Sequence, residues 1–165
     1  MEDWKREVAW LLVALVAVFA FEEGLKVALH TGSPLVIVVS GSMEPVFYRG
    51  DVVLLKGVEP EGVHVGDVIV YRRPGYRYPI IHRVREVYTV NLEGKPERCF
   101  VTWGDNNPFP DPPYPTPEGL LEVRLPDGDV VGCVPAYAVE SKAIMVFPKV
   151  GLIPLWIREF LGIGG

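Results

Sequence analysis

Two short apolar runs flank a turn in Asp67-Val-Ile-Val-Tyr-Arg-Arg-Pro-Gly-Tyr-Arg-Tyr-Pro-Ile-Ile-His-Arg-Val84, near the middle of the 165-residue chain. Both runs are rich in β-branched residues, which favour strands, and Pro74-Gly75 between them is a turn signal. Because side chains alternate along a strand, Ile80, His82 and Val84 share one face. The segment therefore predicts two strands joined by a turn, with a histidine on an apolar face.

Similar β-branched runs, broken by Gly, Pro and Asp, extend over the chain after Gly32. The expected strands are Leu35–Val39, Asp51–Leu55, Asp67–Tyr71, Ile80–Val90, Arg98–Trp103, Leu121–Leu125, Val130–Val134 and Ala143–Phe147. We expect a mainly β domain over residues 31–150, in which a twisted sheet closes towards a partial barrel.

The composition excludes several classes of protein. The formal net charge is −5, whereas phosphate binding needs clustered Lys and Arg, so no nucleic-acid partner is expected. Apolar residues make up 49% of the chain, which excludes a disordered acidic segment. Two cysteines are too few for a disulfide-stapled scaffold or a four-thiolate zinc site. The length suits one compact domain.

Residues 1–30 hold much of the apolar character. Val8–Phe21 contains no polar residue, but as a helix it would cover only about 21 Å of the ~30 Å hydrocarbon layer. Apolar residues continue beyond this run, and Trp4 and Trp10 suit a membrane interface. We expect a retained transmembrane anchor; a cleaved leader and a soluble core helix are the alternatives.

Two further features relate the chain to a bilayer. Lys5 and Arg6 precede the apolar run and favour an N-terminus in the cytosol, with the β domain on the extracytoplasmic side of the cell membrane. In the C-terminal segment, residues 151–165, we expect a short amphipathic helix that begins at Pro154. This helix either packs on the body or lies in the membrane interface.

Prolines are dense in Asn107–Glu118, which reads NPFPDPPYPTPE. Proline lacks the backbone N–H that helices and ladders need, so a stiff surface loop with polyproline character is expected. A rigid connector and a recognition motif for a proline-binding module are both compatible with this composition.

Three segments carry residues that could form a nucleophilic site. Ser40-Gly-Ser42 follows an expected strand, and a hydroxyl at such a turn acts as a nucleophile only with a base in reach. His82 is either a neutral base in a dry site or a core histidine bonded to backbone. Asp105 and Asp111 are candidates to orient that base, although both also suit ordinary turns. Triads are defined by geometry, so spacing alone does not establish one.

With their flanks, these segments resemble the ordered motifs of type I signal peptidases. The matching residues are Val39-Ser-Gly-Ser-Met-Glu-Pro-Val-Phe-Tyr-Arg-Gly-Asp51, Val65-Gly-Asp-Val-Ile-Val-Tyr71, Pro79-Ile-Ile-His-Arg-Val84 and Gly104-Asp-Asn-Asn107. The histidine in the third motif resembles the archaeal and endoplasmic-reticulum type, since the bacterial type has lysine there. The resemblance extends from about Val39 to Asp111, and more loosely over Val131–Pro148.

This resemblance implies a membrane-anchored serine endopeptidase with a β-rich catalytic body. By position, Ser42 matches the nucleophile and His82 the general base, while Ser40 matches a hydroxyl that helps the Ser42 backbone N–H bind the oxyanion. Asp111 is our choice for the carboxylate that orients His82, with Asp105 as a supporting partner. The implied substrates are signal-peptide-bearing preproteins, cut after small residues at −1 and −3. Accessory membrane subunits are left open.

Other interpretations of the residues stay open at this point. A serine–lysine dyad would use Lys56 or Lys142, although neither matches a motif and a neutral lysine needs strong desolvation. A non-catalytic, membrane-tethered β domain would bind partners through the proline-rich segment. Cys99 and Cys133 lie in expected strands and form either a disulfide or two buried thiols. No metal-ligand spacing surrounds the histidines, so neither a metal nor another cofactor is expected.

Overall fold

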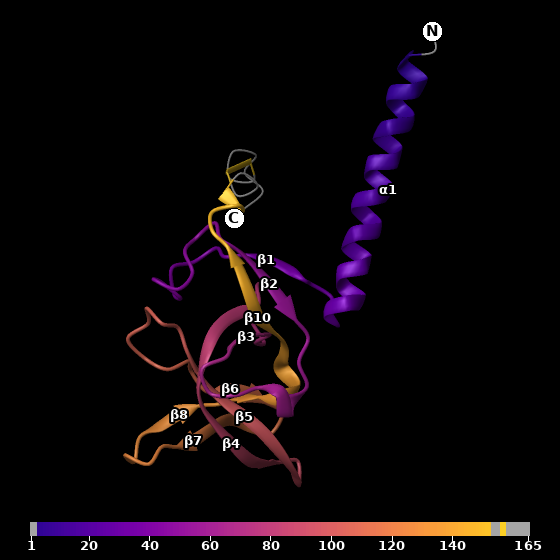
Figure 1. Ribbon diagram of the computed structural model, residues 1–165. Coiled ribbons are helices and arrows are strands. Elements are labelled where there is room, and N and C mark those ends of the chain that lie inside the picture. The colour runs from indigo at the N-terminus through magenta and orange to yellow at the C-terminus, as the bar shows by residue number, and fades with distance from the viewer. Residues whose placement is uncertain (1–2, 153–155, 158–165) are drawn as a thin grey trace.

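A single long helix and a β-rich body make up the computed structural model, which describes residues 3–152 and 156–157. Figure 1 shows helix α1 (Asp3–Leu29) standing away from the body and joining it at one end. The amphipathic helix expected at residues 151–165 lies largely outside the described residues. The expected class, a mainly β body behind an N-terminal apolar helix, is confirmed.

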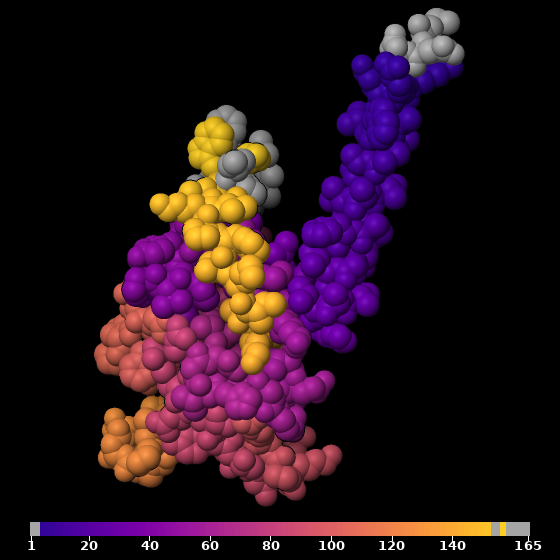
Figure 2. All heavy atoms as spheres, viewed as in Figure 1, coloured from indigo at the N-terminus to yellow at the C-terminus, as the bar shows by residue number. Residues whose placement is uncertain are grey.

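Helix α1 is longer than the polar-free run that the sequence marks. Its 27 residues span about 40 Å, more than the ~30 Å hydrocarbon layer. Trp4–Leu29 has a mean hydropathy of 2.0 and is not buried against the rest of the chain, which argues against a soluble core helix and fits a transmembrane anchor. The space-filling view shows this segment projecting from the body (Figure 2). Lys26 pairs with Glu22 at 3.0 Å and Glu23 at 2.8 Å, so its positive charge offsets one of the two negative charges near the body end.

The body end of α1 is fixed to the end of strand β2 (Val52–Lys56) through Gly57. The Gly57 N–H donates to the Leu29 carbonyl at 2.8 Å, satisfying one of the acceptors left free at a helix C-terminus. A Cβ at position 57 would lie 1.9 Å from the His30 carbonyl oxygen, so only glycine permits this approach. The anchor is thus held close to the sheet that carries the site.

All eight expected strands are present, and two short ones are added. The strands are β1 (Leu35–Ile37), β2, β3 (Val68–Tyr71), β4 (Ile80–Leu92), β5 (Lys95–Trp103), β6 (Tyr114–Thr116), β7 (Gly119–Arg124), β8 (Val130–Gly132), β9 (Val134–Pro135) and β10 (Val139–Phe147). Two 3₁₀ turns, Pro60–Gly62 and Ala136–Ala138, complete the described elements.

The strands form two antiparallel sheets. The larger sheet has the order β1-β2-β10-β3-β4-β5-β9, and the smaller has the order β6-β7-β8. Strand β4 pairs with β3 on one side and β5 on the other, and its ladder with β5 is interrupted by an irregularity between Val84 and Glu86. Because such irregularities bend a strand, β4 and β5 curl around the core, as Figure 1 shows.

The expectation of a surface loop at Asn107–Glu118 is only partly right. Asp111 and Tyr114 within it are buried, and β6 begins at Tyr114. Pro115 is tolerated there because β6 is an edge strand, where one missing N–H removes no ladder bond from a second neighbour. The sequence missed this strand because proline density outweighed its other signals.

Cys99 in β5 and Cys133 beside β8 form a disulfide, which settles the choice that the sequence left open. Both cysteines are fully buried, in a small cluster with Val101 and Val123. The bond links the larger sheet to the segment that follows the smaller one. It therefore restrains the position of β8 relative to β5.

Candidate active site

Ser42 lies in a tight loop between β1 and β2 that is held from both sides. Its neighbour Met43 is fully buried with Phe47 in the apolar cluster that includes Val53 and Leu55 of β2. The Gly50 N–H donates to the Val38 carbonyl and closes the base of the loop. Burial of Met43 leaves the adjacent Ser42 directed away from the core, and its hydroxyl lines a cleft.

The motif Gly104-Asp-Asn-Asn107 supports the same loop from the opposite side. The Asn106 backbone N–H donates to the Ser42 carbonyl at 2.8 Å, and the Asn106 amide donates to the Gly41 carbonyl at 3.0 Å. A Cβ on Gly104 would lie 2.6 Å from the Ser42 carbonyl oxygen, so this contact requires glycine. The backbone at Ser42 is therefore positioned by hydrogen bonds from a distant segment.

His82 occupies the face of β4 that the alternation predicts. Ile80 and Val84 on the same face pack into the apolar core, and His82 is 8% exposed. His82 is opposite Ile69 of β3 in the ladder, so the imidazole stands over the centre of the larger sheet.

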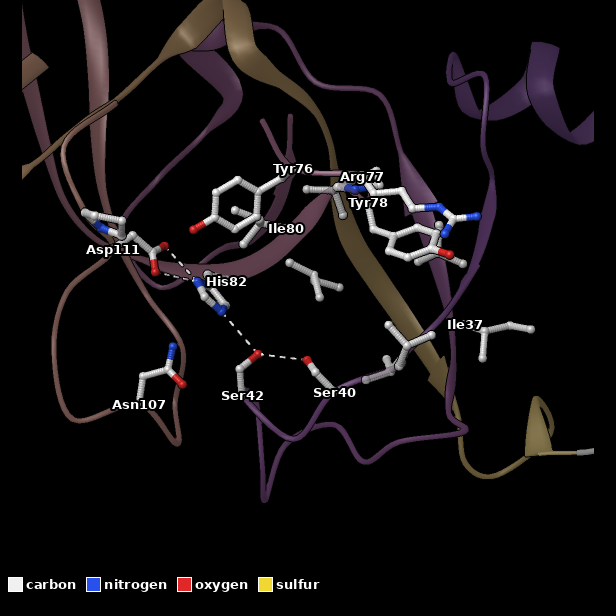
Figure 3. A pocket seen from close by; sticks show the side chains of 17 residues that line it. Ile37, Ser40, Ser42, Tyr76, Arg77, Tyr78, Ile80, His82, Asn107 and Asp111 are labelled. Carbon is white, nitrogen blue, oxygen red and sulfur yellow. Dashed lines mark hydrogen bonds and ion pairs between the residues drawn. The ribbon is translucent and has the colours of Figure 1, made fainter. Parts of the chain in front are cut away.

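Figure 3 shows Ser42, His82 and Asp111 in a continuous hydrogen-bonded series. His82 Nε2 lies 3.1 Å from Ser42 Oγ, while Nδ1 lies 2.8 Å and 2.7 Å from the two Asp111 carboxylate oxygens. An ionised carboxylate only accepts, so Nδ1 carries the proton and the Nε2 of a neutral ring accepts from the Ser42 hydroxyl. The arrangement can accept a proton from Ser42 and hold the resulting imidazolium beside a negative charge.

Asp111 is itself fixed by further bonds. Its backbone N–H donates to the Thr102 carbonyl at 2.9 Å, and its Oδ2 accepts from the Thr102 hydroxyl at 2.6 Å. The Tyr71 hydroxyl donates to the same oxygen at 2.8 Å. Burial and the negative charge of Asp111 raise the pKa of Tyr71 well above its ordinary value, so its hydroxyl stays protonated.

Asp105, the second expected carboxylate, has different partners. Arg83 donates to both of its oxygens, at 2.9 Å from Nε and 2.6 Å from Nη2, and Arg85 adds a bond of 2.7 Å. The Arg83 guanidinium holds the pKa of Asp105 below its ordinary value. Among the described residues, the carboxylate bonded to His82 is Asp111, so Asp105 lies beside the series without joining it.

Ser40 lies next to Ser42, as the motif leads one to expect. The two hydroxyl oxygens are 3.3 Å apart, and both line the cleft in Figure 3. The two lysines considered as alternative bases lie elsewhere. Lys142 binds Asp67 at 3.1 Å and the Gly62 carbonyl at 3.2 Å, and Lys56 is an exposed residue at the end of β2.

The cleft beside Ser42 has a volume of about 800 Å³. One wall is the chain from Val36 to Val39, and the other includes Tyr78–Ile81 at the start of β4. These walls are mostly apolar, and His82 and Asp111 lie at the end that holds Ser42 (Figure 3). Within residues 3–152 and 156–157, no cluster of His, Cys, Asp and Glu is suited to hold a metal ion.

Sequence reasoning did not single out Tyr71, Thr102 or Arg73. Arg73 donates to the carbonyls of Pro112 at 2.8 Å and Pro113 at 2.5 Å, and these two bonds fix the backbone just after Asp111. Tyr71 and Thr102 border His82 from the two strands that flank β4. Strand alternation could have put each on a buried face, but only the pairing of β3, β4 and β5 brings them to one carboxylate.

Several curated proteins are similar to the chain over most of its length, whereas no family model matches it. It is 39% identical over 151 residues to the signal peptidase complex catalytic subunit SEC11 of Komagataella phaffii, covering 90% of this chain and 81% of that protein. The same subunit of Schizophyllum commune is 40% identical over 149 residues, with 79% and 76% covered. That of Lachancea thermotolerans is 36% identical over 149 residues, with 90% and 80% covered.

These identities extend well beyond the four motifs and include the segment after Asp111 that the motifs cover only loosely. They confirm the resemblance that the motifs indicated. The chain is a peptidase, and it belongs to the type I signal peptidase family, in the endoplasmic-reticulum type that includes the SEC11 catalytic subunits.

Proposed function

We propose that this protein removes N-terminal signal peptides from secretory preproteins, with Ser42 as nucleophile and His82 as general base. The observation that carries the proposal is the bonded series from Ser42 Oγ through His82 to Asp111, placed at one end of an apolar cleft. A core histidine bonded to backbone, the alternative from the sequence, would not place Nε2 at 3.1 Å from a serine hydroxyl.

The reaction is an acyl transfer. His82 takes the Ser42 proton as the hydroxyl attacks the peptide carbonyl, and it then donates that proton to the leaving amine. Water, activated by the same imidazole, hydrolyses the acyl-enzyme. Asp111 keeps the Nδ1–H tautomer and stabilises the imidazolium that forms in each half-reaction.

The oxyanion needs donors that are in place before the charge develops. The Ser42 backbone N–H and the Ser40 hydroxyl supply them in this proposal. The Ser40 hydroxyl lies 3.3 Å from the attacking oxygen, which puts it within reach of the carbonyl under attack. The loop is fixed by buried Met43 and by Asn106, so these donors need little rearrangement.

The cleft suits an extended peptide. β1 is an edge strand of the larger sheet, and Val36–Val39 offer backbone groups to which a substrate segment can add as a further strand. The apolar walls suit apolar side chains, and the family resemblance adds a preference for small residues at −1 and −3, the specificity that we propose. The scissile bond would be the substrate peptide bond that lies beside Ser42.

The membrane setting follows from α1. We propose that it holds the catalytic body at the extracytoplasmic surface, where leaders emerge and where a local substrate concentration is high. The buried Cys99–Cys133 disulfide supports this side, because disulfides persist mainly outside the cytosol. Since the relatives are named as subunits of a signal peptidase complex, we also propose that this chain works with accessory membrane subunits.

Cleavage of a preprotein by the full-length chain in detergent micelles tests the proposal. Ser42→Ala is expected to lower kcat by roughly a thousandfold or more, because the attacking group is lost. Ser33→Ala is the matched control, since Ser33 is an exposed residue between α1 and the body. Ser42→Ala activity within about tenfold of the wild type would reject Ser42 as nucleophile.

The rival is a non-catalytic β domain that binds partners through its proline-rich segment. Part of that segment is occupied within the chain: Asp111 is buried and Arg73 binds the carbonyls of Pro112 and Pro113. An inactive wild type that captures a proline-binding module would favour the rival.

A further inference from the structure

Three neighbouring strands present polar side chains around one carboxylate in the buried part of the site. Tyr71 is on β3, His82 on β4 and Thr102 on β5, and all three bind Asp111. Tyr71 and Thr102 are fully buried, and Asp111 is 7% exposed. Within the part of the chain that the structure describes, no buried side-chain polar atom lacks a hydrogen-bond partner.

We propose that Tyr71 and Thr102 are positioning residues for the reaction, which hold the Asp111 carboxylate through Oδ2 so that both of its oxygens face His82 Nδ1. This inference rests on the proposed function of the Ser42–His82–Asp111 series. Neither hydroxyl contacts Ser42 or the leader in this assignment; both act through the carboxylate.

Three donors surround the Asp111 carboxylate. Each oxygen has about two lone-pair sites. The Tyr71 hydroxyl at 2.8 Å and the Thr102 hydroxyl at 2.6 Å both donate to Oδ2. His82 Nδ1 lies 2.7 Å from Oδ2 and 2.8 Å from Oδ1, so its N–H is shared by both oxygens, and the two hydroxyls fix the carboxylate in this position.

The same two bonds affect the charge on Asp111. Hydroxyl donors to a buried carboxylate stabilise its ionised form and draw part of its charge away from the imidazole. Arg73 adds positive charge near Tyr71, and Asp105 adds negative charge near His82. Without the hydroxyls, the Asp111 charge would act more fully on His82 and favour the imidazolium, which has no free Nε2 to accept the Ser42 proton.

The test uses Tyr71→Phe and Thr102→Val, which remove each hydroxyl while keeping the packed volume. Each variant is expected to lower kcat about tenfold or somewhat more, the usual effect of a hydrogen bond to a charged group, with KM unchanged. The acid limb of kcat/KM should move to higher pH in both. Thr102→Ser, which keeps the hydroxyl, should recover the wild-type kcat and acid limb.

Tyr114→Phe is the matched control. Tyr114 is also a buried tyrosine of the same apolar cluster, but its hydroxyl donates to the Arg72 carbonyl and not to Asp111. It should leave the acid limb in place. A limb that moves equally in Tyr114→Phe would show a general packing effect and overturn the proposal.

Wild-type kcat and an unmoved acid limb in Thr102→Val and Tyr71→Phe would also overturn it. If Tyr71→Phe does not fold, Thr102→Val alone decides, because it removes a donor from the same oxygen. Ser42→Ala, assayed in parallel, distinguishes failure of the positioning role from failure of the proposed function: Ser42→Ala activity within about tenfold of the wild type rejects the proposed function. Full activity of the hydroxyl variants beside an inactive Ser42→Ala rejects only the positioning role.

Discussion

A methyl group added at Gly132 should lower the rate of cleavage, because it would displace the backbone that carries Asp111. The Cβ of Gly132→Ala would lie 2.4 Å from the Pro112 carbonyl carbon and 2.5 Å from both the Asp111 carbonyl oxygen and the Pro113 nitrogen. All three atoms are backbone, so no side chain can rotate away. Ordinary contact begins near 3.4 Å, and relief therefore needs a displacement of about 1 Å.

The surroundings decide which segment moves. β8 is restrained because Cys133, the next residue, is bonded to Cys99 in the larger sheet. The Asp111–Pro113 chain is held from the other side by Arg73. If the displacement falls on Asp111, its shortest distance to His82 Nδ1 grows from 2.7 Å to about 3.7 Å, which is no longer a hydrogen bond.

A misplacement of about 1 Å in a catalytic group can lower the rate about a hundredfold. We therefore expect kcat for preprotein cleavage to fall about a hundredfold in Gly132→Ala, with a loss of about 1–3 kcal/mol in unfolding free energy from overpacking. The assay is steady-state cleavage together with thermal unfolding by circular dichroism.

Gly32→Ala is the matched control, because a Cβ at Gly32 meets no atom within 4 Å. It should keep wild-type kcat and stability. A folded Gly132→Ala with kcat within about threefold of the control would refute the reasoning, since the contact with Asp111 would then have relaxed without moving the carboxylate.

Three further predictions concern the disulfide and the second carboxylate. Replacing Cys99 and Cys133 together by Ser should lower the unfolding free energy by about 4 kcal/mol, the loop entropy for a separation of 34 residues; denaturant unfolding measures it, and an unchanged midpoint would contradict it. Asp105→Asn should lower kcat much less than Asp111→Asn does, because Asp105 binds Arg83 and Arg85. A larger loss of kcat in Asp105→Asn than in Asp111→Asn would contradict this prediction. Arg83 depresses the pKa of Asp105 below 3.8, so its contribution to stability is present above about pH 4 and is lost as pH falls through the depressed value. Acid titration of the unfolding midpoint should therefore show a weaker decline below pH 4 in Asp105→Asn, and an identical decline would contradict it.

Local patterns in the sequence predicted much of the fold. The β-branched runs located eight strands, and alternation placed His82 on the buried face of β4. The N-terminal apolar run indicated an anchor within residues 1–30, and helix α1 continues past Glu22 and Glu23 to Leu29. Helix formation depends on local backbone bonds, so paired charges near the end did not stop it.

For the candidate site, the sequence predicted the residues better than it predicted their surroundings. Ser42 and His82 match motif positions, and Asp111 was our choice over Asp105 although only Asp105 lies inside a motif; the structure brings Ser42, His82 and Asp111 together. The proline-rich segment gave no local sign that Asp111 would be buried or that β6 would follow. Its placement depends on Arg73, on Gly132 and on the Thr102 backbone, which are 38, 21 and 9 residues away in the chain.

By itself, the sequence determined the β class, the apolar helix and the residue types of the series, because each depends on neighbours within a few positions. The tertiary structure alone decided that β10 inserts between β2 and β3, that Cys99 meets Cys133, and that Tyr71 and Thr102 meet at Asp111. Strand order sets which side chains share a face, and it is fixed by burial and pairing between segments far apart in the chain. No local pattern carries that information.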